Sequence, residues 1–467
     1  MDLEIGFEGA VRRALGNKFK NYSSFEVCDS WDSHHAQFVR FSLTKKSRKG
    51  KTRRFVAKHF IPVGAGHETA YALCHDPTVL FPREKRNLEL VGSVVKNTLY
   101  SPHALVPRIW GFSERDSMLV MNYLDGVTQR DAILRVARSG SDIEMDYALL
   151  NGIRLIARFS GLCSAFFKEL QSGFDYAQDL DFSTRSSSGQ LKENLARLFY
   201  INNPQLAASI GEYDYSRVFD YLLQQKRINL DFRVSELTEK SKKLNEKIRF
   251  QHNDCNGLNI VGNTVLDLEK FGLGPATADI SSYCTIVGLG NTAILRRGQF
   301  NLYRHAFLAY EYAWEQRDKD LISKLNGYYN GQFRDFVGDE IMTQNEYADW
   351  TMSFFARVIE KNIQLGATYN RYSPAEQRAS SGAVPKVTDH SKIDNYLQEL
   401  FLTVHGLSSM INDCTNSSGV RDYFYLLGKT MQDLGYSVPD QLLSDIQRGG
   451  GIATAVIEEA PRKFKSG

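Results

Sequence analysis

Apolar and polar residues alternate in short runs between residues 24 and 122, a pattern typical of β-strands. The alternation predicts five strands, over 25–28, 37–44, 53–60, 107–112 and 117–121. Between the third and fourth strands, the segment PREKRNLELVGSVVKN places Leu88, Val91 and Val94 or Val95 at helical spacing, which predicts one helix. The first part of the chain is therefore expected to be a small β-rich unit with a single helix.

After Gly126 almost every segment has helical spacing. Ser141 and Glu144 form a capping box ahead of a helix that carries Leu149, Ile153, Ile156 and Phe159. The polar, turn-rich segments 183–189 and 372–392 are the candidates for disordered loops. We therefore expect two lobes, residues 1–125 and 126–467, with a ligand-binding cleft where they meet.

One segment of the second lobe, over residues 250–270, has a different pattern. In QHNDCNGLNIVGNTVLDLEKFG, the apolar runs 258–261 and 264–268 predict two strands, joined by a turn at Gly262 and Asn263. Polar residues of this density usually mark a solvated loop. Here they lie at the ends of predicted buried strands, where catalytic residues are often found.

Composition narrows the class of protein. The 467 residues are 42% hydrophobic and 24% charged, as in a soluble globular protein. The six cysteines form no CxxC pair, which argues against a zinc site and favours free thiols in a reducing compartment. We see no run of eighteen apolar residues and no signal-peptide core, so we predict a cytoplasmic protein without a membrane partner.

The net charge of +3 depends on one basic run, KKSRKGKTRR, between Lys45 and Arg54. Such a run can bind nucleic acid. It is flanked by two predicted strands, however, and a solvated hairpin tip explains it more simply. We therefore expect no nucleic-acid partner.

The predicted hairpin carries the spacing His252-x-Asp254-x-x-x-x-Asn259, which fits the catalytic loop of kinase-type phosphoryl transfer. In such a loop Asp254 would accept the proton of the attacking hydroxyl. Asn259 and Asp267 would offer oxygen atoms to Mg²⁺, and Glu269 could hold a second metal or its water. The eight-residue pattern is weak alone, because it also arises by chance.

Two residues elsewhere strengthen this interpretation. Lys58, late on the third predicted strand, stands where a kinase carries its phosphate-binding lysine, and Glu84 in the following helix could pair with it. Each has a plainer explanation, as a surface lysine and as an acid that favours the helix dipole. Their order along the chain, followed by a strand, a hinge and the loop at His252, favours the kinase interpretation.

The chain thereby resembles the aminoglycoside phosphotransferase and choline kinase superfamily. HNDCNGLNI is similar to the catalytic loop of choline and ethanolamine kinases, and DLEKFGLGPATADISSY to a pattern of the aminoglycoside and sugar-kinase branch. VPRIWGFSERDSMLVMNYLDG resembles the strand, hinge and turn between the lobes. The resemblance implies an α+β, protein-kinase-like bilobal fold with a small antiparallel-β N-lobe and a large, mostly helical C-lobe.

The resemblance also implies ATP and Mg²⁺ as cofactors and a role for each matching residue. Asp254 would be the catalytic base, with Asn259 and Asp267 as magnesium ligands. Lys58, held by Glu84, would contact the α- and β-phosphates. The backbone of Asn122, Tyr123 and Leu124, behind Met121, would meet the adenine, and His252 and Asp279 would brace the loop.

The chain departs from the family in two places. The segment CDSWDSHHAQ, between the first two strands, contains no glycine, so a phosphate-covering loop would have to use Ser30, Ser33 and nearby backbone N–H groups. Asn256 stands where the sugar and aminoglycoside branch often has histidine, which leaves the substrate branch open.

The acceptor expected from the resemblance is a small-molecule hydroxyl: an aminoglycoside, a choline-like or ethanolamine-like amino alcohol, or a sugar. Acidic and aromatic residues mix in 303–315, 333–340 and 345–350, as in sites that hold amines. A helix that packs its aromatic face into the core gives the same pattern, and we favour that explanation for 303–315.

Two other functions stay open. A pseudokinase that binds a nucleotide or a partner without turnover is favoured by the glycine-free segment and disfavoured by the complete set of Asp254, Asn259, Asp267 and Lys58. A protein kinase is the least favoured, because a long polar activation segment and an A-P-E motif are missing after Asp267.

Overall fold

The fold is known from a computed structural model. It describes residues 3–32, 36–47, 50–61, 76–96, 105–139, 142–173, 191–200, 203–211, 213–242, 248–284, 297–327, 350, 353–354, 356–358, 360, 417–434 and 438–448.

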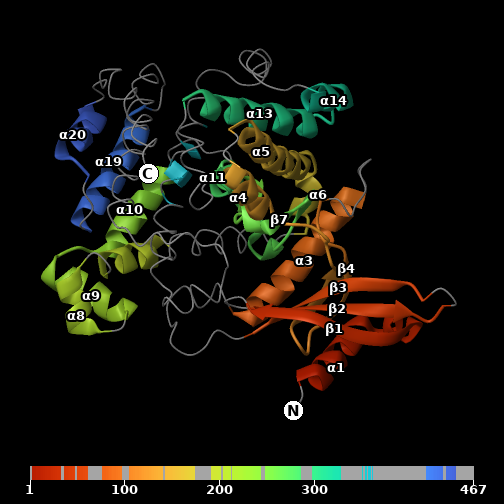
Figure 1. The fold of residues 1–467 in the computed structure, drawn as a ribbon. Helices are drawn as coiled ribbons and strands as arrows, with labels where there is room; N and C mark the ends of the chain where they lie inside the picture. Colours follow the sequence, from red (N-terminus) through yellow and green to blue (C-terminus); the bar gives the residue numbers. More distant parts are fainter. Residues whose placement is uncertain are drawn as a thin grey trace.

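The N-terminal part is built on a five-stranded antiparallel sheet with the strand order β1-β2-β3-β5-β4 (Figure 1). Its strands are β1 (Tyr22–Asp32), β2 (Ala36–Lys45), β3 (Thr52–Phe60), β4 (Ile109–Ser113) and β5 (Met118–Asn122). All five predicted strands are confirmed, although β1 is much longer than expected. The basic run joins β2 to β3, where the backbone N–H of Lys45 donates to the Lys51 carbonyl at 3.1 Å.

Each face of this sheet packs against a different hydrophobic core. Alternation along β3 places Phe55 and Ala57 on the outer face, in a cluster that also contains residues of helix α1 (Leu3–Leu15). Phe60 points the other way and joins the large core, which includes Leu119 and Met121 of β5. The inner face is therefore the one turned toward the helical part of the chain.

Helix α1 and the following 3₁₀ turn (Gly16–Asn21) cover the outer face. The helix end lies so close to β4 that a Cβ on Gly111 would be 2.1 Å from the Ala14 carbonyl oxygen. Arg13 also pairs with Asp116, in the β4–β5 turn, at 2.8 Å. Glycine at position 111 is what permits this approach.

Helix α3 (Pro77–Lys96) lies between the sheet and the helical part in Figure 1. It begins five residues before the predicted start at Pro82. Asp76 explains the earlier start, because its carboxylate accepts the backbone N–H of Thr78 at 2.8 Å and caps the first turn. The helix thus presents an additional turn beside the sheet.

The second part of the chain is mostly helical, as predicted. Its described helices are α4 (Gln129–Ser139), α5 (Asp142–Ala165), α6 (Phe167–Gln171), α8 (Pro204–Ile210), α9 (Tyr215–Gln225), α10 (Leu230–Lys242), α11 (Ala278–Cys284), α13 (Arg297–Glu315), α14 (Lys319–Gly327), α19 (Ser417–Asp433) and α20 (Asp440–Arg448). Helices α5 and α13 pack closely, since a Cβ on Gly161 would be 2.7 Å from the Glu311 carbonyl oxygen.

The predicted hairpin is present but shorter than expected. Two pairs of short antiparallel strands occur, β6 (Ile248–Gln251) with β9 (Gly272–Pro275), and β7 (Ile260–Val261) with β8 (Thr264–Val265). Gly262 takes the left-handed conformation, with φ +57°, in the turn between β7 and β8. Two 3₁₀ turns, η2 (Gly257–Asn259) and η3 (Leu268–Lys270), replace the outer parts of the expected strands.

The aromatic residues of 303–315 belong to the core. Tyr303, Phe307, Tyr310 and Trp314 of α13 are all buried, so the packing explanation is confirmed. Ser141 of the predicted capping box lies outside the described residues, as do 183–189, 333–340, 345–349 and 372–392.

The chain therefore has the predicted α+β class, with a small antiparallel sheet in the N-terminal part and a larger, mostly helical part after it. The expected boundary at 125–126 falls in the connection between β5 and α4 and stays a prediction. Among the described helices, none has the length and apolar character needed to cross a membrane.

We expect Gly111→Ala to destabilise the protein by about 1–3 kcal/mol, because the new methyl group would push α1 away from β4. A matched control is Gly92→Ala in α3, where a Cβ would meet nothing within 4 Å. That change should be neutral or stabilising by up to about 1 kcal/mol. Unfolding temperatures of the two variants test this; equal stability would contradict the close approach.

Candidate active site

Lys58 of β3 is at the centre of a buried group of charges. Its Nζ lies 2.6 Å from a carboxylate oxygen of Glu84 and 3.2 Å from one of Glu269, and it also contacts Asp267. Lys58 and Glu84 are each 1% exposed, whereas the side chain of Asp267 is 27% exposed. Three of the predicted cofactor and metal residues thus surround the predicted phosphate-binding lysine.

The polar face of α3 holds this group in place. Glu84 reaches Lys58, while the neighbouring Arg83 donates from Nε to the Glu269 carbonyl at 3.0 Å. One turn further along, Asn87 donates from Nδ2 to the Leu268 carbonyl at 2.7 Å. The helix therefore fixes both the lysine and the backbone of η3, which carries Glu269.

The electrostatics of the group are unbalanced, since three carboxylates face one lysine. Burial raises the pKa of Glu84 to about 8, and Asp267 and Glu269 add to the rise although Lys58 opposes it. Burial alone would lower the pKa of Lys58, but the carboxylates of Asp267, Glu84 and Glu269 outweigh it and hold that pKa well above its ordinary value. Lys58 is therefore firmly charged, whereas the Glu84 carboxyl keeps its proton to a higher pH than an ordinary glutamate does.

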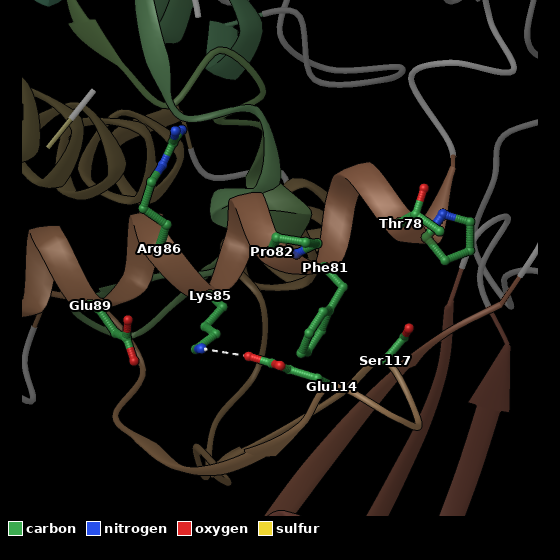
Figure 2. Close-up of a pocket in the computed structure, with 9 residues that line it drawn as sticks. Thr78, Phe81, Pro82, Lys85, Arg86, Glu89, Glu114 and Ser117 are labelled. Carbon is green, nitrogen blue, oxygen red and sulfur yellow. Dashed lines mark hydrogen bonds and ion pairs between the residues drawn. The ribbon is translucent and has the colours of Figure 1, made fainter. Parts of the chain in front are cut away.

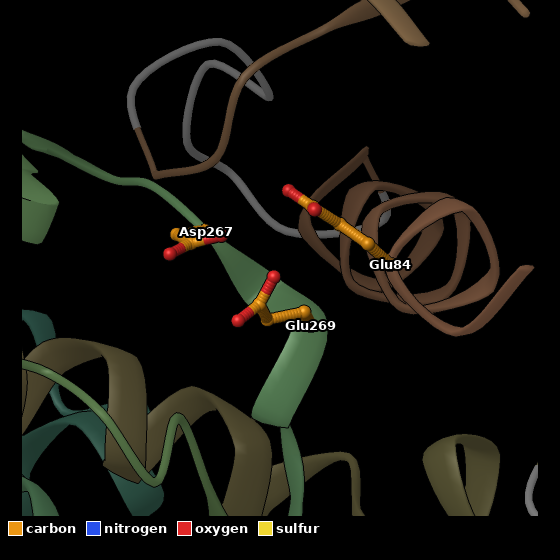
Figure 3. A group of neighbouring side chains, drawn as sticks. All are labelled: Glu84, Asp267 and Glu269. Carbon is orange, nitrogen blue, oxygen red and sulfur yellow. The ribbon is translucent and has the colours of Figure 1, made fainter. Parts of the chain in front are cut away.

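The donor set fits a magnesium ion. Oxygen atoms of Glu84, Asp267 and Glu269 all lie within 4.8 Å of one another (Figure 3). Carboxylate oxygens are the ligands that Mg²⁺ prefers, and a dication would offset the excess of negative charge. Asp267 and Glu269 would hold the ion, with Asn259 as a further candidate ligand.

The predicted catalytic loop, residues 252–259, is braced from α11. The buried carboxylate of Asp279 accepts the backbone N–H groups of His252 and Asn253, at 2.7 and 2.8 Å. The His252 ring spans the loop, with Nε2 2.6 Å from the Leu266 carbonyl and Nδ1 accepting the Asp254 N–H at 3.2 Å. That pattern suits a neutral imidazole with its proton on Nε2.

Asp254, the predicted base, pairs with Lys270 at 2.9 Å between Oδ2 and Nζ. The side-chain amide of Asn259 donates to the Asp254 carbonyl at 2.9 Å, so its oxygen is the end left for an ion. Asn256, the residue that left the substrate branch open, accepts the Leu258 N–H at 2.9 Å and starts η2. In the structure Asn256 therefore serves to cap the η2 turn.

Two non-glycine residues of the site have left-handed backbone. Asn253 has φ +63° and Asp267 has φ +61°. Asparagine and aspartate tolerate this region better than other residues, at a cost of order 1 kcal/mol each. The Asn253 amide then donates to the Lys270 carbonyl at 3.1 Å, which ties the catalytic loop to η3.

The predicted hinge follows β5. The backbone N–H groups of Asn122 and Tyr123 donate to the carbonyls of Arg108 and Arg54, at 3.1 and 3.2 Å. An adenine would therefore have to use the N–H of Leu124 or the carbonyl oxygens of this segment. Met121 is buried behind it, as expected.

Aromatic residues occupy the place expected for a phosphate-covering loop. Ser33 lies outside the described residues. Beside it, Trp31 of β1 stacks on Phe38 of β2, with ring centroids 5.5 Å apart and planes at 3°. Phe38 in turn pairs across the strands with Lys58, whose Nζ is 5.6 Å from its ring centroid.

Sequence reasoning missed several residues that shape this site: Lys270, Arg83, Asn87 and Phe38. A signal existed for Asn87, because a polar residue three positions after Glu84 lies on the same helix face, next to the apolar Leu88. Lys270 carried no such signal, since its partner is sixteen residues away through two turns.

A separate cavity of about 380 Å³ lies between α3 and the β4–β5 turn. Figure 2 shows Phe81 and Lys85 of the helix pointing toward Glu114 and Ser117 of the β4–β5 turn, and Pro82 also lines the cavity. Lys85 and Glu114 pair across it at 3.4 Å. None of the predicted site residues lines this cavity.

No protein-family model matches the chain, and no curated protein matches it. Among solved structures, it is similar to an ethanolamine kinase from Plasmodium vivax, with 13% identity, a TM-score of 0.36 and 82% of each chain covered. It is also similar to an aminoglycoside phosphotransferase from Streptomyces rimosus, with 11% identity and a TM-score of 0.30, over 76% of this chain and 99% of that one. Both TM-scores are below 0.5, so the roles proposed below rest on this chain's own geometry.

In metal-free buffer we expect the Glu84 carboxyl to make stability fall as pH rises from about 5 to 8, by up to about 1.4 kcal/mol per pH unit. The free energy of unfolding falls with rising pH because the unfolded chain loses the Glu84 proton above the ordinary glutamate pKa of 4.5, whereas the folded protein still keeps it. Glu84→Gln removes the titrating group, so its unfolding temperature should fall less over this range. Parallel pH profiles for the two proteins would contradict the raised pKa.

Proposed function

We propose that this protein is an ATP- and Mg²⁺-dependent phosphotransferase that phosphorylates a hydroxyl of a small molecule. The observation that carries the proposal is the contact of the buried Lys58 with Asp267 and Glu269, which follow Asp254 closely in the sequence. Phosphoryl transfer needs positioning and charge neutralisation more than covalent chemistry, and this arrangement supplies both.

Each residue would have a distinct part. Lys58, kept charged by its carboxylate neighbours, would bind phosphate oxygens, and Asp267 and Glu269 would hold the ion. Asp254 would orient the acceptor hydroxyl and take its proton. Lys270 would compensate the charge of Asp254 before the acceptor arrives and hold its carboxylate in position.

The proposed acceptor is an aminoglycoside, an amino alcohol such as ethanolamine or choline, or a sugar. This class comes from the resemblance of HNDCNGLNI and DLEKFGLGPATADISSY to the aminoglycoside phosphotransferase and choline kinase superfamily. The buried aromatic face of α13 does not help to choose among them, because it packs into the core. A screen for ATP consumption with members of each class, in the presence of Mg²⁺, is the direct test.

A nucleotide-binding module without turnover is the second candidate. The specific observation that favours it is the Trp31–Phe38 pair beside Lys58, in the place of a glycine-rich cover. The two candidates differ in one measurable respect, because only the enzyme requires the carboxylate of Asp254.

We expect Asp254→Asn to reduce kcat at least about 100-fold, because the amide cannot take the proton of the acceptor. Nucleotide affinity, measured by calorimetry, should change less than about twofold, since Asp254 handles the acceptor rather than ATP. Asp422→Asn, an exposed site on α19, is the matched control. A variant that keeps most of its turnover with a true acceptor would rule out Asp254 as the base.

We expect Asp267→Asn to weaken the dependence of nucleotide binding on Mg²⁺ at least about tenfold, because only Glu269 and the neutral Asn259 would then remain to hold the ion. The measurement is the nucleotide dissociation constant at several Mg²⁺ concentrations, for wild type and variant. If both proteins respond alike to Mg²⁺, Asp267 serves only as a structural partner of Lys58.

A further inference from the structure

Lys58 is more enclosed than a phosphate-binding lysine needs to be. Its Nζ has three carboxylate neighbours and lies 4.8 Å from the Phe60 ring centroid and 5.6 Å from that of Phe38. The side chain is 1% exposed. A phosphate oxygen can therefore reach Nζ only after one of these neighbours moves.

Most of the enclosure is anchored. Glu84 is buried on a twenty-residue helix, and the backbone of Glu269 is held by Arg83. Phe60 is buried and packs against Phe81 of α3, with centroids 5.9 Å apart. The two partly exposed neighbours of the ammonium group are Asp267 and Phe38.

Phe38 stands in a row of paired residues on the inner face of the sheet. Trp31 pairs with Phe38 across β1 and β2, and Phe38 pairs with Lys58 across β2 and β3. Directly paired residues lie on the same face, so the two rings extend from the lysine outward to the sheet edge. Trp31, 44% exposed, is the outermost member of the row.

The chemistry of this row is unsuited to phosphate. An aromatic face is attracted to cations such as Lys58 and repels anions. Phosphates are usually held by backbone N–H groups, in loops whose glycines permit a close approach. Phe38 therefore stabilises Lys58 where it is and shields it from a phosphate oxygen on that side.

We infer that Phe38, backed by Trp31, is a gate that must be displaced before the phosphates of a nucleoside triphosphate can contact Lys58. The inference rests on the proposed function for the identity of the ligand. β1 is an edge strand, paired on one side with β2, and most of its residues are exposed, so Trp31 behind Phe38 lies on a strand with a free edge in the sheet order. Apparent nucleotide affinity is then reduced by the fraction of molecules whose gate is closed.

The test begins with the gate alone, without nucleotide. An amine-reactive acetylating reagent is applied and the labelling rate of Lys58 is read by peptide mass spectrometry. Phe38→Gly should raise that rate at least about tenfold if the open state is a minor one in the wild type. Lys270, already 20% exposed, is the internal reference and should be labelled at the same rate in both proteins.

The chain offers a matched control on the same sheet. Lys85 lies over the Phe112 ring at 3.5 Å from its centroid, a lysine–phenylalanine pair outside the site. Phe112→Gly should change the labelling of Lys85 and leave that of Lys58 unchanged. Phe38→Ala serves as a second variant if Phe38→Gly has a low unfolding temperature.

Nucleotide binding is then measured on the same proteins. With ATP and Mg²⁺, Phe38→Gly should bind at least about fivefold more tightly than wild type. The fluorescence of Trp31, obtained as the difference between the spectra of the wild type and of the Trp31→Phe variant, should change when ATP binds to the wild type. Weaker binding by Phe38→Gly would overturn the gate, because it would show that the ring supports the nucleotide.

The gate and the phosphotransferase function can be overturned independently. An unchanged labelling rate of Lys58 in both Phe38 variants overturns the gate whatever the ligand is. Faster labelling without any ATP binding at millimolar concentration leaves the gate in place and overturns the proposed phosphotransferase function.

Discussion

The rest of the site depends on the ion pairs that the buried ammonium group of Lys58 makes with three carboxylates. Lys58 joins strand β3, helix α3 and the turn after β8, which are far apart in sequence. Without it, three carboxylates would face one another in a largely buried space. Removing one partner of a buried ion pair costs about 3–5 kcal/mol, so this lysine fastens strand β3 to helix α3 and to the turn after β8.

Side chains, more than sheet hydrogen bonds, give the acidic segment its shape. Strands β7 and β8 have only two residues each, too few for a stable ladder. Asp279 holds the backbone of His252 and Asn253 from one side, while Arg83 and Asn87 hold η3 from the other. Helices thus position a loop whose own backbone pairing is weak, and the left-handed residues are kept by these contacts.

Short-range patterns predicted the strands, helix α3 and the residues whose spacing is local, including Lys58, Glu84 and the loop at His252. The hairpin strands were overestimated, because the 3₁₀ turns capped by Asn256 and Asp267 take up the outer residues of the two apolar runs. The approach of Phe38 to Lys58 depends on the register of β2 and β3, which the tip at Lys45 and Lys51 sets. The Lys270–Asp254 pair depends on two successive turns, so local periodicity could not reveal it.

The position of β1 at an edge of the sheet also affects how readily the protein would aggregate. An eleven-residue strand at the border of a sheet offers unpaired N–H and C=O groups to any other chain that could add to it. β1 carries Glu26, Asp29 and Asp32, and its pairing with β2 shifts register twice, between Tyr22 and Ser24 and between Val27 and Asp29. Acidic side chains and bulges are both features that discourage edge-to-edge association, so the strand that bears Trp31 is protected against aggregation.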